Sequence, residues 1–255
     1  MRRRQFIQVS SAGSLLTLVT TQARTAAAWK TFTLTMQLNI QDTERPVRVW
    51  LPLPNSVESY QQVLDTRWSG TAADAQIFRD VVYGAPMLYA EWTTPGPREL
   101  VVTSQFKTLD RANVPNSASR ADGAVYLPDV RRFLAPTKHI PTDGIVLTTA
   151  QEATQGARGS VEQARAIYDW VVDNSLRDPK VKGCGRGDIK GMLETGNLGG
   201  KCADINSLFV GLCRAVGIPA RENFGIRVGP SQHFKSLGKI GDVTGAQHCR
   251  AEFYA

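Results

Sequence analysis

Cysteine is scarce in this sequence, and its spacing excludes two common uses of the residue. The 255 residues include only four cysteines, at positions 184, 202, 213 and 249. So few thiols, spread this widely, do not form the dense disulfide framework of a small secreted scaffold. No two of them have the C-x-x-C spacing of a zinc site. An oxidising compartment would permit disulfides here without requiring them.

The N-terminus lacks a hydrophobic run long enough to span a membrane. Arginines at positions 2–4 precede an uncharged, moderately apolar run over 9–19, which is too short and too rich in Ser, Thr and Gly for a bilayer span. Ala26-Ala27-Ala28 then offers an A-x-A-like cleavage site before Trp29. We predict a signal peptide over residues 1–28 and no stable membrane insertion after processing.

The route of export is indicated by the first residues. Arg3-Arg4-Gln5-Phe6-Ile7 resembles the twin-arginine signal, in which two arginines precede a bulky apolar pair. The expected partner is then the twin-arginine export machinery, which moves folded proteins. The alternative is a mildly basic signal for the general secretory route. Either route predicts a bacterial protein of the periplasm or the extracellular space.

Acidic residues are absent from residues 1–28, and this absence explains much of the basic character of the chain. The formal net charge is +7, and four arginines of this segment account for more than half of it, so the remainder carries +3. Lysines and arginines do not form a stripe interleaved with aromatic residues, as a phosphate-binding surface would require. Nucleic acid is therefore not an expected partner.

Hydrophobic periodicity predicts an α+β fold. Residues 31–38, 47–51 and 100–103 alternate with a period of two, which indicates an antiparallel β module over 29–125. A connecting segment rich in Pro, Thr and Asp follows over 126–159, and the last unit covers 160–255. No internal repeat is present.

Two helices and two strands are predicted in the last unit. Ser160 and Gln163 have the spacing of a capping box, and the helix that follows is expected to end at Asp178-Pro179. A second helix is expected over 201–216, with Gly217 at its C-terminal cap. Alternation predicts strands over 224–228 and 247–254.

Cys202 is the residue most suited to chemistry. A Gly-Gly turn leads into the first turn of its helix, where free backbone N–H groups and the helix dipole favour a thiolate. The same N–H groups could stabilise an oxyanion. The alternative is that Cys202 is simply a small buried apolar residue.

Histidine is the scarcest candidate for a base, with only three in the chain. His139 is expected in a loop, and His233 lies in a stretch rich in Gly and Ser. His248 begins a strand in which Cys249 faces the apolar side, so His248 projects to the other face. We predict His248 as the base, although a surface histidine is the plain alternative. A metal site is not expected, because His248 and Cys249 point to opposite faces, and no cofactor is predicted.

Disulfide pairing stays open in part. Cys213 lies about 16 Å along the helix from Cys202, at about 1.5 Å per residue, so these two cannot be bridged. Pairing of Cys184 with Cys249 or with Cys202 remains geometrically open. The alternation of side chains along the last strand places Cys249 on the apolar face, so we predict that it is a core residue.

Two motifs resemble the core of bacterial transglutaminase-like proteins. The first runs from Gly199-Gly200-Lys201-Cys202 to Arg214-Ala215-Val216-Gly217-Ile218-Pro219-Ala220-Arg221, and the second is Gln247-His248-Cys249-Arg250-Ala251-Glu252-Phe253-Tyr254. The resemblance implies a papain-like core over 160–255, with Cys202 as the nucleophile and His248 as its base. It also implies an Asp on the strand after the His strand. This chain ends at Ala255, so we expect the core to be C-terminally truncated. Asp242 and Glu252 are not convincing substitutes.

The resemblance implies acyl transfer through a thioester of Cys202, with a protein or peptide as substrate. Water would release the acyl group in a hydrolase, and an amine would release it in a cross-linking enzyme; we favour hydrolysis. Calcium regulation is not expected, because no acidic loop is present. The rival hypothesis is a non-catalytic exported binding or scaffolding module.

Overall fold

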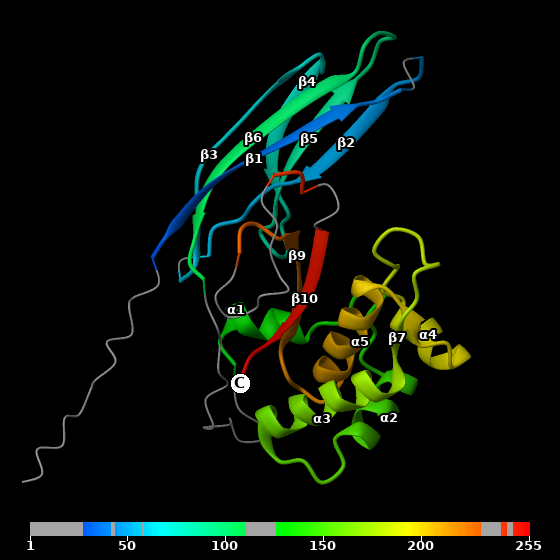
Figure 1. Ribbon diagram of the computed structural model, residues 1–255. Helices are drawn as coiled ribbons and strands as arrows, with labels where there is room; N and C mark the ends of the chain where they lie inside the picture. The colour runs from blue at the N-terminus through cyan, green and yellow to red at the C-terminus, as the bar shows by residue number, and fades with distance from the viewer. Residues whose placement is uncertain (1–27, 42–43, 58, 111–125, 231–240, 244–246) are drawn as a thin grey trace, which may run out of the picture.

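The structure, a computed structural model, describes residues 28–41, 44–57, 59–110, 126–230, 241–243 and 247–255. A β-rich part precedes a part built of helices and short strands, and the two lie one above the other (Figure 1). This arrangement confirms the predicted α+β class with an N-terminal antiparallel β module. Among the described residues, no helix has both the length and the apolar character that a membrane span requires.

The N-terminal part is a sandwich of two three-stranded antiparallel sheets. One sheet has the order β1-β6-β3 and the other β2-β5-β4. Their bounds are β1 Lys30–Asn39, β2 Val47–Pro52, β3 Gln61–Gly70, β4 Asp74–Arg79, β5 Pro86–Trp92 and β6 Glu99–Thr108. Alternate residues of β5 and β6 point between the sheets, so Leu88, Ala90, Leu100 and Val102 are buried together.

The connecting segment, for which the sequence indicated no helix, contains three. They are α1 Pro128–Arg131, the 3-10 helix η1 Arg132–Leu134 and α2 Gly144–Ala153. Val146 and Ala150 of α2 are completely buried in the core of the lower part. Burial against other helices, rather than a strong local signal, therefore stabilises α2.

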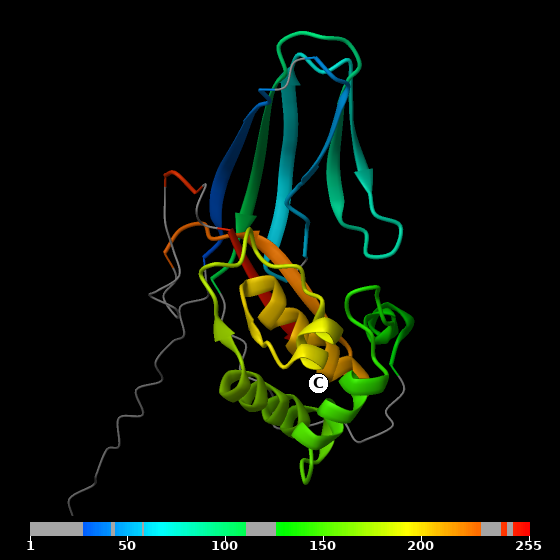
Figure 2. The ribbon, with the colours of Figure 1, turned by 90° about the vertical axis from the view of Figure 1, so that its right-hand side faces the viewer.

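The remaining elements surround one buried helix. They are α3 Gly159–Asn174, β7 Leu176–Arg177, α4 Ile189–Thr195, β8 Gly199–Gly200, α5 Cys202–Ala215, β9 Ala220–Ile226 and β10 Gln247–Phe253. Leu208 and Leu212 of α5 are fully buried, and Phe209 packs edge-on against Phe253 of β10 at 6.2 Å between ring centroids. Strands β9 and β10 form an antiparallel pair along α5, with α3 and α2 at the other side (Figure 2).

The bounds of α5 confirm the predicted second helix to within one residue at each end. Gly217, at φ +83°, adopts the left-handed conformation that ends the helix. The buried Arg214 then ties the helix end to its surroundings, because Nε donates to the carbonyl of Ala220 at 2.8 Å and Nη1 donates to that of Ala135 at 2.9 Å. The strand after α5 thereby starts at Ala220, four residues earlier than predicted.

The capping box predicted at Ser160 and Gln163 is wrong. The N-cap residue of α3 is Arg158, whose backbone N–H donates to the carboxylate of Glu162 at 2.9 Å. Ser160 is buried instead of capping the helix. The other end also differs from the prediction, because α3 stops at Asn174. There β7 pairs in parallel with β8, which draws the chain into an extended conformation before Asp178.

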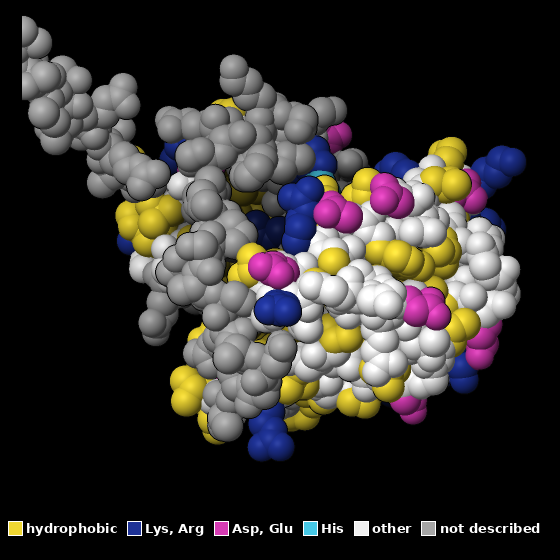
Figure 3. All heavy atoms as spheres, turned by 90° about the horizontal axis from the view of Figure 1, so that it is seen from below, with side chains coloured by type: hydrophobic (Ala, Val, Ile, Leu, Met, Phe, Trp, Pro, Cys, Tyr) yellow, Lys and Arg dark blue, Asp and Glu magenta, His cyan; other side chains and the backbone are white. Residues whose placement is uncertain are grey.

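The face of the molecule below the sandwich mixes charges of both signs. Acidic and basic side chains alternate with apolar ones over the described surface there (Figure 3). The sandwich meets the lower part through Tyr83, whose ring stacks on that of Phe133 at 6.0 Å, and through Arg250, which lies over the ring of Tyr60 at 5.9 Å. Contacts of the sandwich with η1 and with β10 therefore join the two parts of the chain.

Candidate active site: three thiols at the start of α5

The N-terminus of α5 is held by a single buried carboxylate. Asp204 accepts hydrogen bonds from the backbone N–H groups of Arg186 and Gly187, both at 2.8 Å, and from that of Lys201 at 2.9 Å. Glycine is required beside it, because a Cβ on Gly185 or Gly200 would overlap the carboxylate. Asp204 therefore fastens the loop around residue 185 and Lys201 to the first turn of α5, and the two glycines before Lys201 form strand β8 and not the predicted turn.

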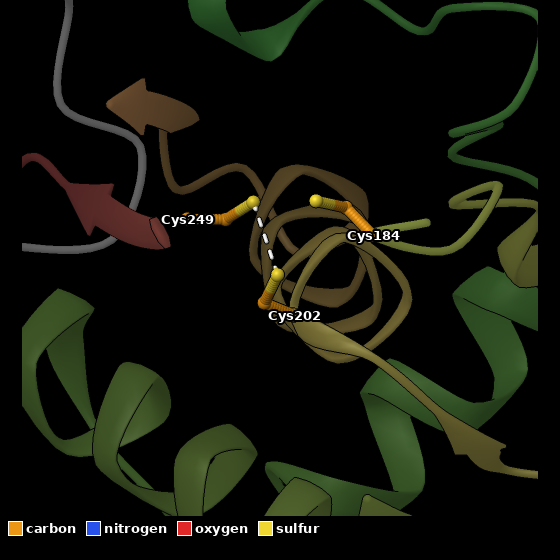
Figure 4. A group of neighbouring side chains, drawn as sticks. All are labelled: Cys184, Cys202 and Cys249. Atoms are coloured by element: carbon orange, nitrogen blue, oxygen red, sulfur yellow. Dashed lines mark hydrogen bonds between the residues drawn. The ribbon is translucent and has the colours of Figure 1, made fainter. Parts of the chain in front are cut away.

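Cys202 is the first residue of α5, as predicted, and its sulfur meets two other thiols. Cys184 comes from the loop that Asp204 holds, and Cys249 comes from β10 (Figure 4). The Cys249 thiol donates a hydrogen bond to the Cys202 sulfur at 3.4 Å, and all three sulfurs lie within 4.8 Å of one another. Each cysteine is unbridged. The predicted core position of Cys249 is confirmed, and its side chain packs directly on the site.

The surroundings of the three thiols make Cys202 the most acidic of the group. Burial by itself raises the pKa of Cys202, but hydrogen bonds from the thiols of Cys249 and Cys184 and from the N–H groups of Cys249 and Ala203 lower it below its ordinary value. Burial, together with the charge on Cys202, raises the pKa of Cys184. Burial and the hydrogen bond to Cys202 raise the pKa of Cys249 far above its usual range. Of the three thiols, Cys202 therefore loses its proton at the lowest pH.

The order of these pKa values predicts the order in which the thiols react. Because only the thiolate is nucleophilic, iodoacetamide should modify Cys202 at a lower pH than Cys184 or Cys249. The rate at Cys202 should level off at a pH where the other two are still rising. Peptide mass spectrometry across a pH series measures each site separately. Cys213, which is completely buried, is the internal control and should stay unmodified in the folded protein. Faster modification of Cys184 at every pH would contradict this order.

One of the backbone donors suggested for an oxyanion is already engaged. The N–H of Ala203 donates to the carbonyl of Cys184 at 2.9 Å. This hydrogen bond closes the loop onto the start of α5 and brings Cys184 next to Cys202. It also means that the helix N-terminus supports the thiol cluster as well as any developing negative charge.

The structure places His248 beside Cys249 on β10, without a hydrogen bond from its ring to the Cys202 sulfur among the described residues. His248 lies on β10 directly before Cys249, is half-buried, and its Nδ1 lies 2.9 Å from the carbonyl oxygen of Cys249. His139 lies in an exposed loop, as predicted, and His233 falls outside the described residues.

The two nearby acids have other environments. Glu252 forms ion pairs with Arg221 at 2.9 Å and with Arg250 at 3.0 Å, so its carboxylate is already neutralised. Asp242 is exposed. The Asp that the family resemblance implies beside the histidine stays a prediction.

Cys184 and Asp204 are the site residues that the sequence did not reveal. The sequence-based expectation of no metal site considered only His248 and Cys249, whereas the structure groups the Cys249 thiol with those of Cys184 and Cys202. A signal was present in the alternating glycines of Gly183-Cys184-Gly185-Arg186-Gly187, since three of these glycines have positive φ and form a tight loop around the thiol.

The geometry is thus a thiol at the start of a buried helix that packs on an antiparallel strand pair. Residues 147–255 match the family model described as Transglutaminase-like superfamily. The chain carries a transglutaminase-like superfamily domain. The match begins at residue 147, within α2, and so includes most of α2 in addition to the 160–255 core indicated by the motifs.

Two individual proteins are similar over most of the chain. An uncharacterized protein of Haemophilus influenzae is 38% identical over 239 residues, which is 88% of this chain and 64% of that protein. The chain therefore spans somewhat less than two thirds of this relative. A crystal structure of a candidate cysteine protease from Cytophaga hutchinsonii superposes with a TM-score of 0.62 at 16% identity, over 89% of this chain and 75% of the other. At that identity the likeness supports a shared fold.

Proposed function

We propose that this protein is an exported cysteine hydrolase or acyltransferase that acts on amide bonds of proteins or peptides through a thioester on Cys202. The observation that carries the proposal is the environment of Cys202. Its thiol lies at the start of α5, and surrounding hydrogen-bond donors lower its pKa. Membership of residues 147–255 in the transglutaminase-like superfamily supports the same chemistry.

In the proposed reaction, the Cys202 thiolate attacks the carbonyl carbon of the substrate. A carbon–sulfur bond forms, the carbon–nitrogen bond breaks, and the leaving amine takes a proton from His248. Water then attacks the thioester, with His248 accepting its proton, and the acid is released with the Cys202 thiolate. An amine in place of water would give a cross-linked product. We favour hydrolysis.

His248 has to turn toward Cys202 for this role. Its neighbour Cys249 already touches the Cys202 sulfur, so the backbone of β10 lies against the start of α5 at this point. The proposal requires that the contact between His248 Nδ1 and the Cys249 carbonyl be released and that the ring then approach the thiol. Catalytic hydrogen bonds are commonly long or misaligned before substrate binds.

Export is part of the same proposal. The arginine pair and the small residues of the N-terminus support translocation by the twin-arginine machinery and removal of residues 1–28. The enzyme would then act on proteins or peptides in the periplasm or outside the cell.

The proposal is tested by trapping the thioester. Reduced protein is mixed with p-nitrophenyl acetate and quenched in acid, and peptide mass spectrometry locates the acetyl group. We expect acetylation at Cys202, with a burst of p-nitrophenol equal to the amount of protein. The replacement His248→Ala should slow the burst, and fluorogenic peptide amides then identify the amide substrate. Acetylation of other groups only, with none at Cys202, would exclude the thioester mechanism.

A non-catalytic binding module is the second candidate. It is favoured by the absence of a hydrogen bond between Cys202 and His248 among the described residues. The same trapping experiment separates the two, because a binding module would give neither a burst nor an acyl group on Cys202.

A further inference from the structure

The thiols of Cys184, Cys202 and Cys249 converge on one point from three separate segments. A loop, the first turn of a helix and a strand each supply one cysteine (Figure 4). The chain has only four cysteines, yet three of their sulfurs lie within 4.8 Å of one another. The proposed acyl-transfer reaction uses one of these thiols as its nucleophile, so the convergence of the other two calls for a separate explanation.

The spacing of the three sulfurs suits a metal ion. Zinc–sulfur bonds are about 2.3 Å long, and two sulfurs of a tetrahedral zinc site therefore lie about 3.8 Å apart. The Cys202 and Cys249 sulfurs are 3.4 Å apart, and no pair in the group exceeds 4.8 Å. Small side-chain rotations that move each sulfur by a few tenths of an ångström would bring all three to the sulfur–sulfur spacing of a zinc site.

The segments that carry the thiols are fixed independently of one another. Asp204 holds the loop of Cys184 through the N–H groups of Arg186 and Gly187. Cys249 lies opposite Phe224 in the β9–β10 ladder, and Asn206 Nδ2 donates to its carbonyl at 3.4 Å. Such support outside the ligand set keeps metal ligands in position before the metal binds.

We propose that Cys184, Cys202 and Cys249 bind one thiophilic metal ion, with Zn²⁺ as the best chemical match, in a three-thiolate site with its fourth position open. Thiolates prefer Zn²⁺ or Cu⁺ to Mg²⁺ and Ca²⁺. Zinc replaces the thiol protons of the group, which pass to the buffer. Cys184 and Cys202 are partly exposed, so an ion can enter from solvent.

Metal binding at this site has a consequence for catalysis, and this step rests on the proposed function. A Cys202 sulfur bound to zinc has its electron pair engaged and cannot attack a carbonyl. The metal-bound protein is then a blocked form of the enzyme, and removal of the metal releases the nucleophile.

Cobalt and zinc titrations of the full chain test the site. The protein is reduced, freed of metal with a chelator and titrated with Co²⁺, whose bonds to thiolates give charge-transfer absorption in the near ultraviolet. We expect one equivalent to bind, and zinc-edge X-ray absorption should count three sulfurs at about 2.3 Å. Neither measurement needs a variant. Absence of thiolate-to-cobalt absorption, or a zinc shell of nitrogen and oxygen only, would overturn the proposal.

Variants assign the ligands. Cys184→Ala and Cys249→Ala should each weaken zinc binding about 100-fold or more, or lower the cobalt band to about two thirds of its wild-type intensity per ion. Cys213→Ala is the matched control, because Cys213 lies on α5 with Cys202 but is buried away from the three thiols. This variant should bind zinc as the wild type does. Thermal melts establish that each variant is folded. Unchanged binding in both ligand variants would overturn the proposal.

Acetylation by p-nitrophenyl acetate then separates the metal site from the proposed function. One equivalent of Zn²⁺ should suppress the burst of the wild type and of Cys213→Ala, and a chelator should restore it. Three-sulfur zinc binding in a protein that is never acetylated would sustain the metal site and exclude the enzyme. Acetylation of Cys202 that is unaffected by added Zn²⁺, with no sulfur in the zinc shell, would exclude the metal site and sustain the enzyme.

Discussion

Replacement of Cys202 by Ala is expected to lower acyl transfer by about 10⁴-fold or more, down to the level of the uncatalysed reaction. Removal of a covalent nucleophile abolishes the thioester pathway, and losses of about 10⁶ in kcat have been measured where nucleophile and base act as a unit. Steady-state hydrolysis of a fluorogenic peptide amide measures the loss. Cys202→Ser should be nearly as inactive, because a serine hydroxyl is far less acidic than this thiol.

Two controls make the result specific to the nucleophile. Cys213→Ala removes a thiol from the same helix, but its side chain is completely buried away from the site, so activity should stay within about twofold of the wild type if the variant folds. His248→Ala should lose about 10²- to 10⁴-fold, the usual contribution of a general acid–base group. Substantial amide hydrolysis by Cys202→Ala would assign the activity to another residue.

The elements that define the site were predictable because their signals are local. The apolar stripe of α5, the glycine that ends it and the alternation of β10 all lie within a few residues of the positions that they determine, and the structure confirms each of them. The α+β class followed from the same periodicities. Cys202 could be placed at the start of its helix because Gly199 and Gly200 directly precede it.

The remaining features depend on contacts between distant segments. Helix α2 is set by burial of Val146 and Ala150, which no local pattern marked. Cys184 reaches the site because Asp204, about 20 positions later, binds the backbone of its loop and because the N–H of Ala203 donates to the Cys184 carbonyl. The alternation of side chains along β10 correctly predicted that Cys249 is buried. It could not predict that the Cys249 thiol would contact Cys202.

Because Asp204 holds the loop of Cys184 against α5, its replacement is expected to have the second large effect, on stability. Asp204→Ala should destabilise the protein by about 3–5 kcal/mol, because three backbone N–H groups that now donate to the carboxylate would lose their acceptor in a partly buried place. Urea unfolding measures the change. Asp173→Ala, at an exposed position of α3, is the matched control and should change stability by no more than about 0.5 kcal/mol.

Asn in place of Asp204 distinguishes the hydrogen bonds from the packing. An amide keeps one oxygen, which can still accept from Arg186 and Gly187, but it directs an NH₂ group at the N–H of Lys201. We therefore expect Asp204→Asn to lose less stability than Asp204→Ala.

Gly185→Ala tests the same contact between Asp204 and the loop of Cys184, by a change in the loop. Its new Cβ would overlap the carboxylate, and alanine disfavours the φ of +97° found there. In this variant and in Asp204→Ala, the loop should move away from α5 and withdraw the Cys184 thiol from Cys202. Cys202 then loses a hydrogen-bond donor, so its alkylation by iodoacetamide should shift to higher pH while Cys184 becomes more reactive at neutral pH. Unchanged reactivity of both thiols, despite a measured loss of stability, would mean that Asp204 supports the fold without positioning the site.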